Sequence, residues 1–265
     1  MDDARRLHVE VGGAGPALVL GHGFGGSARN FRGQARALGT RCRVVRFDAR
    51  GHARSEAPAD PAAYASEAFV ADVGRVLDRV GARAAVIGGL SMGAGIALRF
   101  ALAHPERVRA LVLAAFPAGA DQPGSYAAVA ERFAERIERV GLDAAGAEFV
   151  WGPSSGLDAH AAALVRRGFL EHSAHAMAHV LRRVIAAQPS VAALAPLVAR
   201  LRVPTLVVVG ARDRLSLDAS RAVAAAVPGA ALVEIPEAGH LVNLARPDEF
   251  DAAVAAFLDA HAAEL

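Results

Sequence analysis

The stretch Gly88-Gly89-Leu90-Ser91-Met92-Gly93-Ala94-Gly95 constrains the fold of this chain more than any other. The apolar run 84–87 before it is typical of a buried parallel strand, and residues 96–101 after it follow a helical pattern. Ser91 is therefore predicted at a sharp corner between a strand and a helix, where the backbone is strained and the hydroxyl is exposed. Glycines two positions before and after the serine remove β-carbons that would clash there.

Such a corner also places the Met92 N–H and the positive end of a helix where an oxyanion would form. In a chain of 265 residues with 26 glycines, a Gly-x-Ser-x-Gly pattern is only a moderate signal, because glycine-rich strand ends also serve packing. A catalytic serine requires the rest of the chain to supply a base, an acid and a second oxyanion donor.

Strand and helix patterns alternate on both sides of the Ser91 corner. This alternation predicts a parallel, doubly wound α/β sheet, which binds ligands at the carboxyl ends of its strands. The expected strands are 7–11, 17–20, 43–47, 84–87, 108–113, 204–209 and 231–235, and the expected helices outside the middle of the chain are 29–38, 65–80, 191–201, 216–227 and 247–261.

Between residues 117 and 189 the strand patterns stop and amphipathic helices replace them. We expect residues 1–116 and 190–265 to form the α/β core, and residues 117–189 to form a helical lid over the strand ends. Trp151, the single tryptophan, either lines the pocket or packs between lid and core. The expected lid helices are 127–140, 144–151, 160–171 and 175–187.

A glycine-rich loop, residues 21–27, follows the second expected strand. No Lys-Ser/Thr pair follows it, so a phosphate-binding loop is not expected. We expect its backbone to approach a ligand instead, with Gly23 and Phe24 at the substrate and the Phe24 N–H as the second oxyanion donor. His22 in the same loop is interpreted as structural, because a better base follows later in the chain.

The acid and the base follow the last two expected strands, as Asp213 and His240. A histidine can take the proton of a serine hydroxyl and later return it to the leaving group. An aspartate would hold the imidazole in the required tautomer. The order serine, aspartate, histidine on one sheet edge predicts Ser91, Asp213 and His240 as a catalytic triad.

Other polar residues have structural interpretations. Asp48 and Arg50 either take part in catalysis or form a turn-stabilising network at the rim of the site, and the network is preferred. His172, His175 and His179 would share a helix face, but no carboxylate or cysteine pattern accompanies them. We therefore expect no metal site, and no cofactor is expected either.

Composition excludes several classes of protein. A content of 54% hydrophobic and 21% charged residues argues against disorder, and a formal net charge of +2 gives no reason to expect a nucleic-acid partner. Cys42 is the only cysteine, so no intrachain disulfide is possible. No signal-peptide pattern or membrane-spanning run is present, so we expect a cytoplasmic protein without membrane contact, and the oligomeric state stays open.

Five motifs, taken together, resemble those of the α/β-hydrolase family. They are His22-Gly23-Phe24-Gly25-Gly26, Asp48-Ala49-Arg50-Gly51-His52, Gly89-Leu90-Ser91-Met92-Gly93, Gly210-Ala211-Arg212-Asp213 and Gly239-His240. The chain looks most like the lid-bearing group of enol-lactone hydrolases, small esterases, carbon–carbon bond hydrolases and cofactor-free haloperoxidases. The resemblance covers nearly the whole chain and implies a mostly parallel, doubly wound sheet with a helical lid inserted after the sixth strand.

By this resemblance the family's triad carries over to Ser91, Asp213 and His240, and its oxyanion donors carry over to Phe24 and Met92. Dehalogenases and epoxide hydrolases of the same fold use an aspartate nucleophile, so the serine argues against both activities.

Two departures from the family pattern stand out. Relatives begin with a two-stranded hairpin, of which only residues 7–11 are clear, and Ala53 stands where relatives often have glycine, which is expected to alter a turn and little else.

The sequence favours a serine hydrolase that cleaves a carboxylic ester or lactone of a small molecule through an acyl-enzyme. A carbon–carbon bond hydrolase, an acyltransferase or cyclase, a perhydrolase, and a ligand-binding or signalling protein with little turnover stay open. The carbon–carbon hydrolase needs groups that polarise a second carbonyl. Its candidates are Arg166, Arg167, Arg182 and Arg183, whose preferred interpretation is as solvated arginines.

Overall fold

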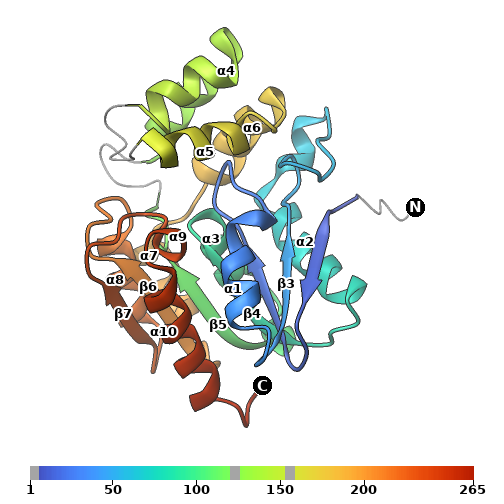
Figure 1. Cartoon of the computed structure of the whole chain (residues 1–265), viewed down its shortest axis with the longest axis vertical. Coiled ribbons are helices and arrows are strands. Elements are labelled where there is room, and N and C mark those ends of the chain that lie inside the picture. The colour runs from blue at the N-terminus through green and yellow to red at the C-terminus, as the bar shows by residue number, and fades with distance from the viewer. Residues whose placement is uncertain (1–5, 120–125, 153–158) are drawn as a thin grey trace.

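Seven strands form one sheet in the described chain, which comprises residues 6–119, 126–152 and 159–265 of the computed structural model (Figure 1). The strand order is β1-β3-β2-β4-β5-β6-β7, and every neighbouring pair is parallel except β1 with β3. The expected doubly wound, mostly parallel α/β sheet is confirmed. The strands are β1 (Val9–Gly12), β2 (Ala17–Gly21), β3 (Arg43–Phe47), β4 (Ala85–Leu90), β5 (Val108–Ala114), β6 (Thr205–Gly210) and β7 (Ala231–Ile235).

Helices cover both faces of the sheet, because each central strand sends alternate side chains to opposite faces. In β5, Leu111 and Leu113 join one buried apolar cluster, whereas Ala110 and Val112 join the other. A strand that is buried on both faces appears in the sequence as a continuous apolar run, so the positions of these strands could be predicted. The first cluster includes residues of α2 (Ser66–Arg79), α3 (Met92–Ala103), α7 (Val191–Val198) and α8 (Leu217–Ala226). The second includes residues of α9 (Val242–Ala245) and α10 (Pro247–Ala260), and Ala35 of α1 (Arg32–Ala37) packs against it.

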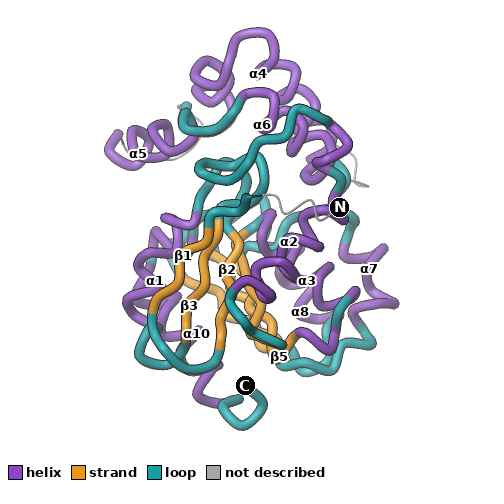
Figure 2. The backbone as a smooth tube through the Cα atoms, turned by 90° about the vertical axis from the view of Figure 1, so that its right-hand side faces the viewer, coloured by secondary structure: helices purple, strands orange, loops and turns teal. Residues whose placement is uncertain are grey.

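A group of helices between β5 and α7 lies over the carboxyl ends of the strands, as Figures 1 and 2 show from two directions. This group consists of α4 (Tyr126–Phe149), α5 (Ala159–Phe169), α6 (Ala174–Val180) and the π-helical turn η5 (Leu181–Ile185).

None of the described helices combines the length and the apolar character that crossing a membrane requires.

The helices expected at 127–140 and 144–151 are both present within α4, where the non-helical backbone of Gly141, with φ 80° and ψ 174°, separates them. Other elements differ from expectation. The insertion follows the fifth strand, β5, and not a sixth, because β1 is the only strand before β2 in the described residues. The helix expected at 29–38 divides into a 3₁₀ turn, η1 (Ala28–Phe31), and α1. Three short elements were not expected, because three or four residues show no helical period: η2 (Pro61–Tyr64), η3 (Pro105–Arg107) and α9.

A buried ion pair joins the loop after β3 to α2. Arg50 donates to both carboxylate oxygens of Asp72, at 2.7 Å from Nε and 2.6 Å from Nη2, and neither side chain is more than 3% exposed. Arg50 also donates to the carbonyls of Ala63 and Ala68, at 2.7 and 3.2 Å. These contacts place Arg50 in a structural network, as the sequence favoured.

We expect Asp72→Ala to lower the free energy of unfolding by about 3–5 kcal/mol, because it leaves the buried Arg50 guanidinium without its counter-charge. Urea unfolding followed by circular dichroism measures this loss. Asp78→Ala on the same helix is the matched control: Asp78 is 69% exposed in its pair with Arg107, so its removal should cost less than about 1 kcal/mol. Equal losses in the two variants would contradict this account.

Candidate active site

Ser91 lies at the corner between β4 and α3. Its φ of 53° and ψ of −112° are strained for a residue with a β-carbon, and its N–H donates to the Ala114 carbonyl at 2.9 Å. A β-carbon on Gly93 would lie 2.1 Å from the Gly21 carbonyl oxygen, and one on Gly89 would lie 2.5 Å from the carbonyl carbon of Gly93. Close backbone packing around the serine therefore requires both glycines.

Asp213 and His240 meet at the carboxyl ends of β6 and β7. His240 Nδ1 lies 2.9 Å from Asp213 Oδ2, and Asp213 Oδ1 accepts the N–H groups of Leu215 and Ser216 at 3.1 and 3.2 Å. Burial raises the pKa of Asp213, but hydrogen bonds from His240, Leu215 and Ser216 outweigh burial and hold that pKa below its ordinary value. The ionised carboxylate favours the His240 tautomer with its proton on Nδ1, which leaves Nε2 able to accept one.

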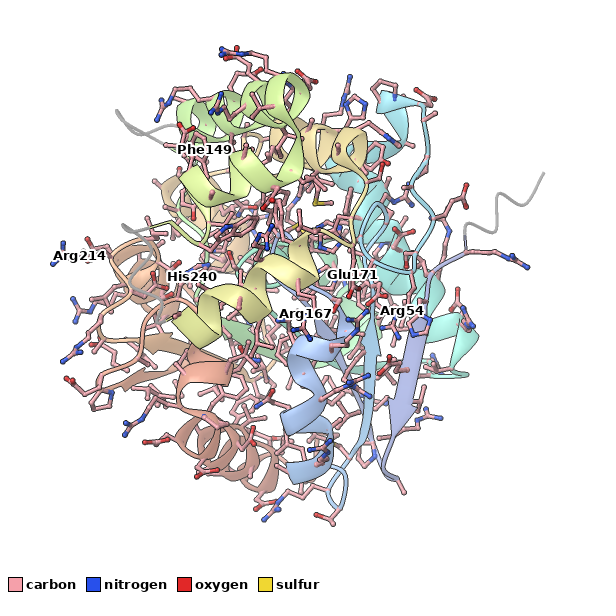
Figure 3. All side chains as sticks on the ribbon, turned by 45° about the horizontal axis from the view of Figure 1, so that its top comes forward. Arg54, Phe149, Arg167, Glu171, Arg214 and His240 are labelled. Carbon is pink, nitrogen blue, oxygen red and sulfur yellow. The ribbon has the colours of Figure 1, made fainter. Side chains whose placement is uncertain are left out.

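Ser91 lies at the same edge of the sheet as this pair. Strands β4, β5, β6 and β7 are parallel neighbours, so the loops that follow them open in one direction. Figure 3 turns this end of the molecule forward and labels His240. Among the described residues no hydrogen bond joins Ser91 to His240. Such contacts are often long in unliganded enzymes and shorten when substrate binds.

The loop after β2 lies against Ser91. A β-carbon on Gly23 would be 3.6 Å from Cβ of Ser91. The Phe24 N–H belongs to this loop, the Met92 N–H is the first of α3, and neither has a hydrogen-bond acceptor within the described residues. Both amides therefore keep their donors available to a group bound beside the serine.

His22 holds this loop through both of its ring nitrogens. Nδ1 donates to the Gly23 carbonyl at 2.7 Å, and Nε2 accepts the Ala49 N–H at 2.9 Å. The tautomer follows because a backbone N–H can only donate. Burial lowers the pKa of His22 to about 4, so the ring is neutral at pH 7. With both nitrogens occupied, His22 has the structural role that the sequence favoured.

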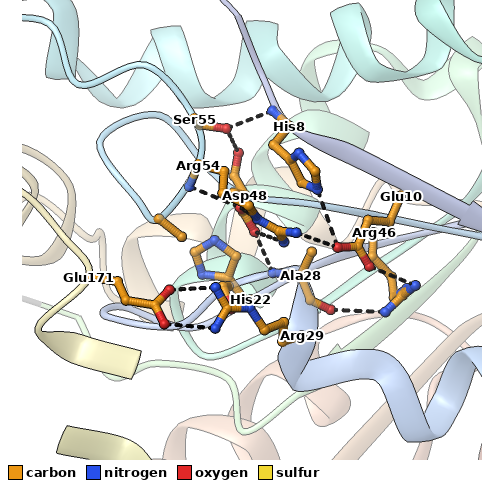
Figure 4. Close-up of polar contacts among 12 residues, drawn as sticks. His8, Glu10, His22, Ala28, Arg29, Arg46, Asp48, Arg54, Ser55 and Glu171 are labelled. Atoms are coloured by element: carbon orange, nitrogen blue, oxygen red, sulfur yellow. Dashed lines mark hydrogen bonds and ion pairs between the residues drawn. The ribbon is translucent and has the colours of Figure 1, made fainter. Parts of the chain in front are cut away.

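Asp48 anchors the turn next to this loop (Figure 4). Its Oδ1 accepts the Ala28 N–H at 2.7 Å, and its Oδ2 accepts the backbone N–H and the Nε of Arg54 at 3.1 and 2.9 Å. Burial raises the pKa of Asp48, but the hydrogen bonds from Arg54 and Ala28 hold it below its ordinary value. Asp48 therefore stabilises a turn, which agrees with the network interpretation.

Phe24 connects the loop after β2 to aromatic side chains of α4 and α5. Its ring meets Phe133 and Phe169 edge-on, at centroid distances of 5.9 and 6.0 Å. The Trp151 ring lies 5.6 Å from that of Phe169 and fills the space that a β-carbon on Gly146 would need. Trp151 thus belongs to this aromatic cluster and is separated from Phe24 by one ring.

The three histidines of the helical group do not converge. His172 is buried, and its Nδ1 accepts the Ala53 N–H at 2.8 Å. Ala53 has a φ of 42°, so the alanine adopts a left-handed conformation that glycine takes more easily. His175 and His179 lie on α6 with ring centroids 6.3 Å apart. The part of the chain that the structure describes holds no group of three or more potential metal ligands.

Two residues near the Asp213–His240 pair were missed by sequence reasoning. Burial, with the charge of Asp213 as a second cause, raises the pKa of Tyr126 to about 12, which indicates that its hydroxyl lies near that carboxylate. The Ser216 hydroxyl lies 3.2 Å from His240 Nδ1. The sequence offered a signal for Ser216, because this serine stands three residues after Asp213 at the start of an expected helix. It offered no signal for Tyr126.

Known proteins resemble this chain across most of its length. The sequence profile of the alpha/beta hydrolase fold family matches residues 16–247. A protein of Bacillus subtilis (strain 168), provisionally named 2-succinyl-6-hydroxy-2,4-cyclohexadiene-1-carboxylate synthase, is 28% identical over 92% of this chain and 91% of its own length. Three further curated relatives are matched over 12% to 40% of their lengths.

Two solved structures extend the similarity to the helical group. A thermophilic esterase from Thermogutta terrifontis is 28% identical, with a TM-score of 0.85, over 96% of this chain and 93% of its own. The enol-lactonase from Burkholderia xenovorans LB400 is 27% identical, also with a TM-score of 0.85, over 97% of this chain and 98% of its own. Coverage of this extent includes the helices above the sheet as well as the sheet itself.

We expect Gly93→Ala to lower the free energy of unfolding by about 2 kcal/mol or more, because the added β-carbon overlaps the Gly21 backbone. Gly33→Ala is the matched control, since a β-carbon at Gly33 in α1 meets nothing within 4 Å. That control should stabilise the protein by about 0.5–1 kcal/mol. Thermal unfolding of both variants measures the difference, and a gain of stability in both would refute the packing account of the corner.

Stability should fall as the pH drops from about 6.5 toward 4. In this window His22 becomes protonated in the unfolded chain. In the folded chain its pKa is about 4, so it stays neutral and protonation favours unfolding. The loss attributable to His22 is on the order of 3 kcal/mol. Urea unfolding of wild type and His22→Asn at several pH values tests this, because the variant cannot titrate there. Identical pH slopes would argue against it.

Proposed function

We propose that this chain, which belongs to the alpha/beta hydrolase fold family and is a hydrolase, cleaves a carboxylic ester or lactone of a small molecule through an acyl-enzyme. One observation carries most of the proposal: the 2.9 Å hydrogen bond between His240 Nδ1 and the buried carboxylate of Asp213, at the sheet edge that holds the Ser91 corner. That bond prepares Nε2 of His240 as a base, which a serine hydroxyl needs in order to react at neutral pH.

In the first half of the proposed reaction, Ser91 Oγ attacks the ester carbonyl carbon while His240 Nε2 takes the hydroxyl proton. The tetrahedral intermediate then breaks its bond to the alkoxy leaving group, and the imidazolium gives its proton to that oxygen. In the second half His240 deprotonates a water molecule, which attacks the acyl carbonyl carbon. The bond to Ser91 Oγ then breaks, the imidazolium returns its proton to that oxygen, and the carboxylic acid leaves. Asp213 stabilises the imidazolium in both halves. With a lactone, the leaving oxygen becomes a hydroxyl that stays on the acyl chain, so hydrolysis of the acyl-enzyme releases one hydroxy acid.

The negative charge of each tetrahedral intermediate is proposed to lie between the N–H groups of Phe24 and Met92. Phe24 follows Gly23, which lies against Ser91, and Met92 directly follows Ser91 and adds the positive end of α3. Losing one such donor typically costs about 10²–10³ in rate. These groups stabilise the transition state without titrating, so their contribution does not depend on pH.

We further propose that residues 117–189 act as a lid over a core formed by residues 1–116 and 190–265. The Ser66 hydroxyl, on core helix α2, donates to the Arg183 carbonyl at 2.9 Å and fixes the η5 end of this segment. The helices lie over the strand ends where ligands bind in such sheets (Figure 1). A lid in this place would define the shape of the acyl pocket.

Substrate contacts are proposed for Gly23, Phe24 and Trp151. Gly23 lies against Ser91, so a bound acyl group would pass over its backbone. The rings of Phe24 and Trp151 belong to the aromatic cluster that joins the loop to the proposed lid helices. An apolar wall of this kind favours an uncharged acyl group of modest size.

A carbon–carbon bond hydrolase is less well supported, because two of its candidate arginines already have carboxylate partners. Arg166 donates to both oxygens of Asp143, at 2.7 and 2.6 Å. Arg182 contacts Glu131 at 2.8 Å and Glu138 at 2.5 Å. The named activities of the two similar solved structures, an esterase and an enol-lactonase, also favour an ester or lactone.

We expect wild-type protein to release a burst of p-nitrophenol from p-nitrophenyl acetate or butyrate, in proportion to enzyme concentration. Ser91→Ala should abolish the burst and lower turnover by on the order of 10⁴-fold or more, because the acyl-enzyme can no longer form. Stopped-flow absorbance measures the burst, and mass spectrometry identifies the acylated serine.

Ser190→Ala is the control for this experiment. Ser190 caps α7 by accepting the Ala193 N–H at 3.0 Å, so its loss should cost about 1 kcal/mol of stability and leave the burst intact. Wild-type turnover that persists in Ser91→Ala would exclude the mechanism. A wild type that binds these esters without a burst or turnover would favour the ligand-binding alternative.

A further inference from the structure

The hydroxyl of Ser216 lies beside the hydrogen bond between His240 and Asp213. Its Oγ is 3.2 Å from His240 Nδ1, and the residue is 1% exposed. The backbone N–H of Ser216 donates to Asp213 Oδ1 at 3.2 Å. One residue therefore touches the carboxylate and the imidazole at the same time, through two different atoms.

A helix cap would be the ordinary explanation of this serine, since Ser216 immediately precedes α8. A capping serine accepts a hydrogen bond from an amide two or three residues further on. The Ser216 side chain makes no such bond. Its hydroxyl turns instead toward the imidazole, so capping does not account for its orientation.

Hydrogen-bond chemistry gives this contact a direction. The ionised Asp213 carboxylate only accepts, so His240 Nδ1 carries the proton that lies between them. The Ser216 oxygen faces the same protonated nitrogen and therefore accepts from it. That proton has two acceptors, the carboxylate oxygen at 2.9 Å and the hydroxyl oxygen at 3.2 Å.

We propose that Ser216 is a positioning residue that holds the His240 imidazole in its reactive orientation. The inference rests on the proposed function, because the group being positioned is the proposed base. An imidazole held by one hydrogen bond can swing about that bond, whereas a second acceptor on Nδ1–H restricts the swing. This keeps Nε2 directed at the Ser91 hydroxyl, where small displacements of a reacting group reduce the rate strongly.

The first test is the low-field proton resonance of His240 Nδ1–H, recorded without substrate. We expect Ser216→Ala to displace or broaden this resonance, because the proton loses one acceptor and exchanges faster with water. Ser216→Thr keeps the hydroxyl and should retain the wild-type signal. Urea unfolding checks that each variant is folded, and an unchanged resonance in a folded Ser216→Ala protein would overturn the proposal.

The second test separates orientation of the base from substrate binding. With p-nitrophenyl butyrate, Ser216→Ala should lower kcat about tenfold, the effect of one hydrogen bond on a barrier, while KM changes less than about twofold. Ser216→Thr should recover most of kcat. A change confined to KM, or no change in either constant, would contradict a role in positioning the base.

Ser220→Ala is the matched control, because it removes another buried serine hydroxyl from α8. The Ser220 Oγ accepts the Phe116 N–H at 3.0 Å and has no contact with the imidazole among the described residues. It should lose stability and leave the His240 resonance and kcat unchanged. If Ser220→Ala and Ser216→Ala alter the resonance alike, the effect comes from α8 as a whole and the proposal fails.

Failure of the proposed function would look different. Turnover that survives Ser91→Ala would remove the acyl-enzyme mechanism, yet the resonance would still show whether Ser216 holds the imidazole. A normal Ser91→Ala result combined with an unaltered resonance in Ser216→Ala would keep the mechanism and exclude only the positioning role.

Discussion

The close approach of β2 to the start of α3 is the constraint on which the rest of the site depends. A β-carbon at Gly93 would fall 2.1 Å from the Gly21 carbonyl oxygen, so these two backbones lie closer than any side chain permits. Because β2 leads into the Phe24 loop and α3 begins at Met92, this contact sets the separation of the two amides beside Ser91. Stability of the corner and the proposed oxyanion geometry therefore depend on the same packing.

Three buried carboxylates near the strand ends differ in their hydrogen-bond and ion-pair partners. These partners distinguish a structural role from a proposed catalytic one. Asp72 is paired with Arg50, and Asp48 accepts hydrogen bonds from Arg54, so both carboxylates already have a permanent positive partner. Asp213 has backbone amides and a histidine instead. Among the described residues no arginine pairs with it, so its negative charge would be available to stabilise an imidazolium when His240 takes a proton. This distinguishes the proposed catalytic acid from the structural ones.

The sequence could predict those parts of the molecule that depend on local pattern. Buried apolar runs located the strands, and residues that follow parallel strands must share one edge, so the proximity of Asp213 and His240 was predictable. Contacts that depend on how distant segments of the chain pack together could not be predicted from the sequence. His172 accepts a hydrogen bond from Ala53 across 119 residues. The orientation of the Ser216 hydroxyl depends on where β7 places His240 relative to α8, which no local pattern records.

Phe24 links the two halves of the proposed site. Its amide is a proposed oxyanion donor, while its ring packs against Phe133 and Phe169 of the helices above the sheet. A β-carbon on neighbouring Gly25 would lie 2.6 Å from the Phe169 ring, so the loop backbone itself is in contact with these helices. An acyl group that displaced the Phe24 ring would also move its amide. Packing of the proposed lid and stabilisation by the proposed oxyanion donor would thus be coupled, and productive substrates would be those that leave this ring in place.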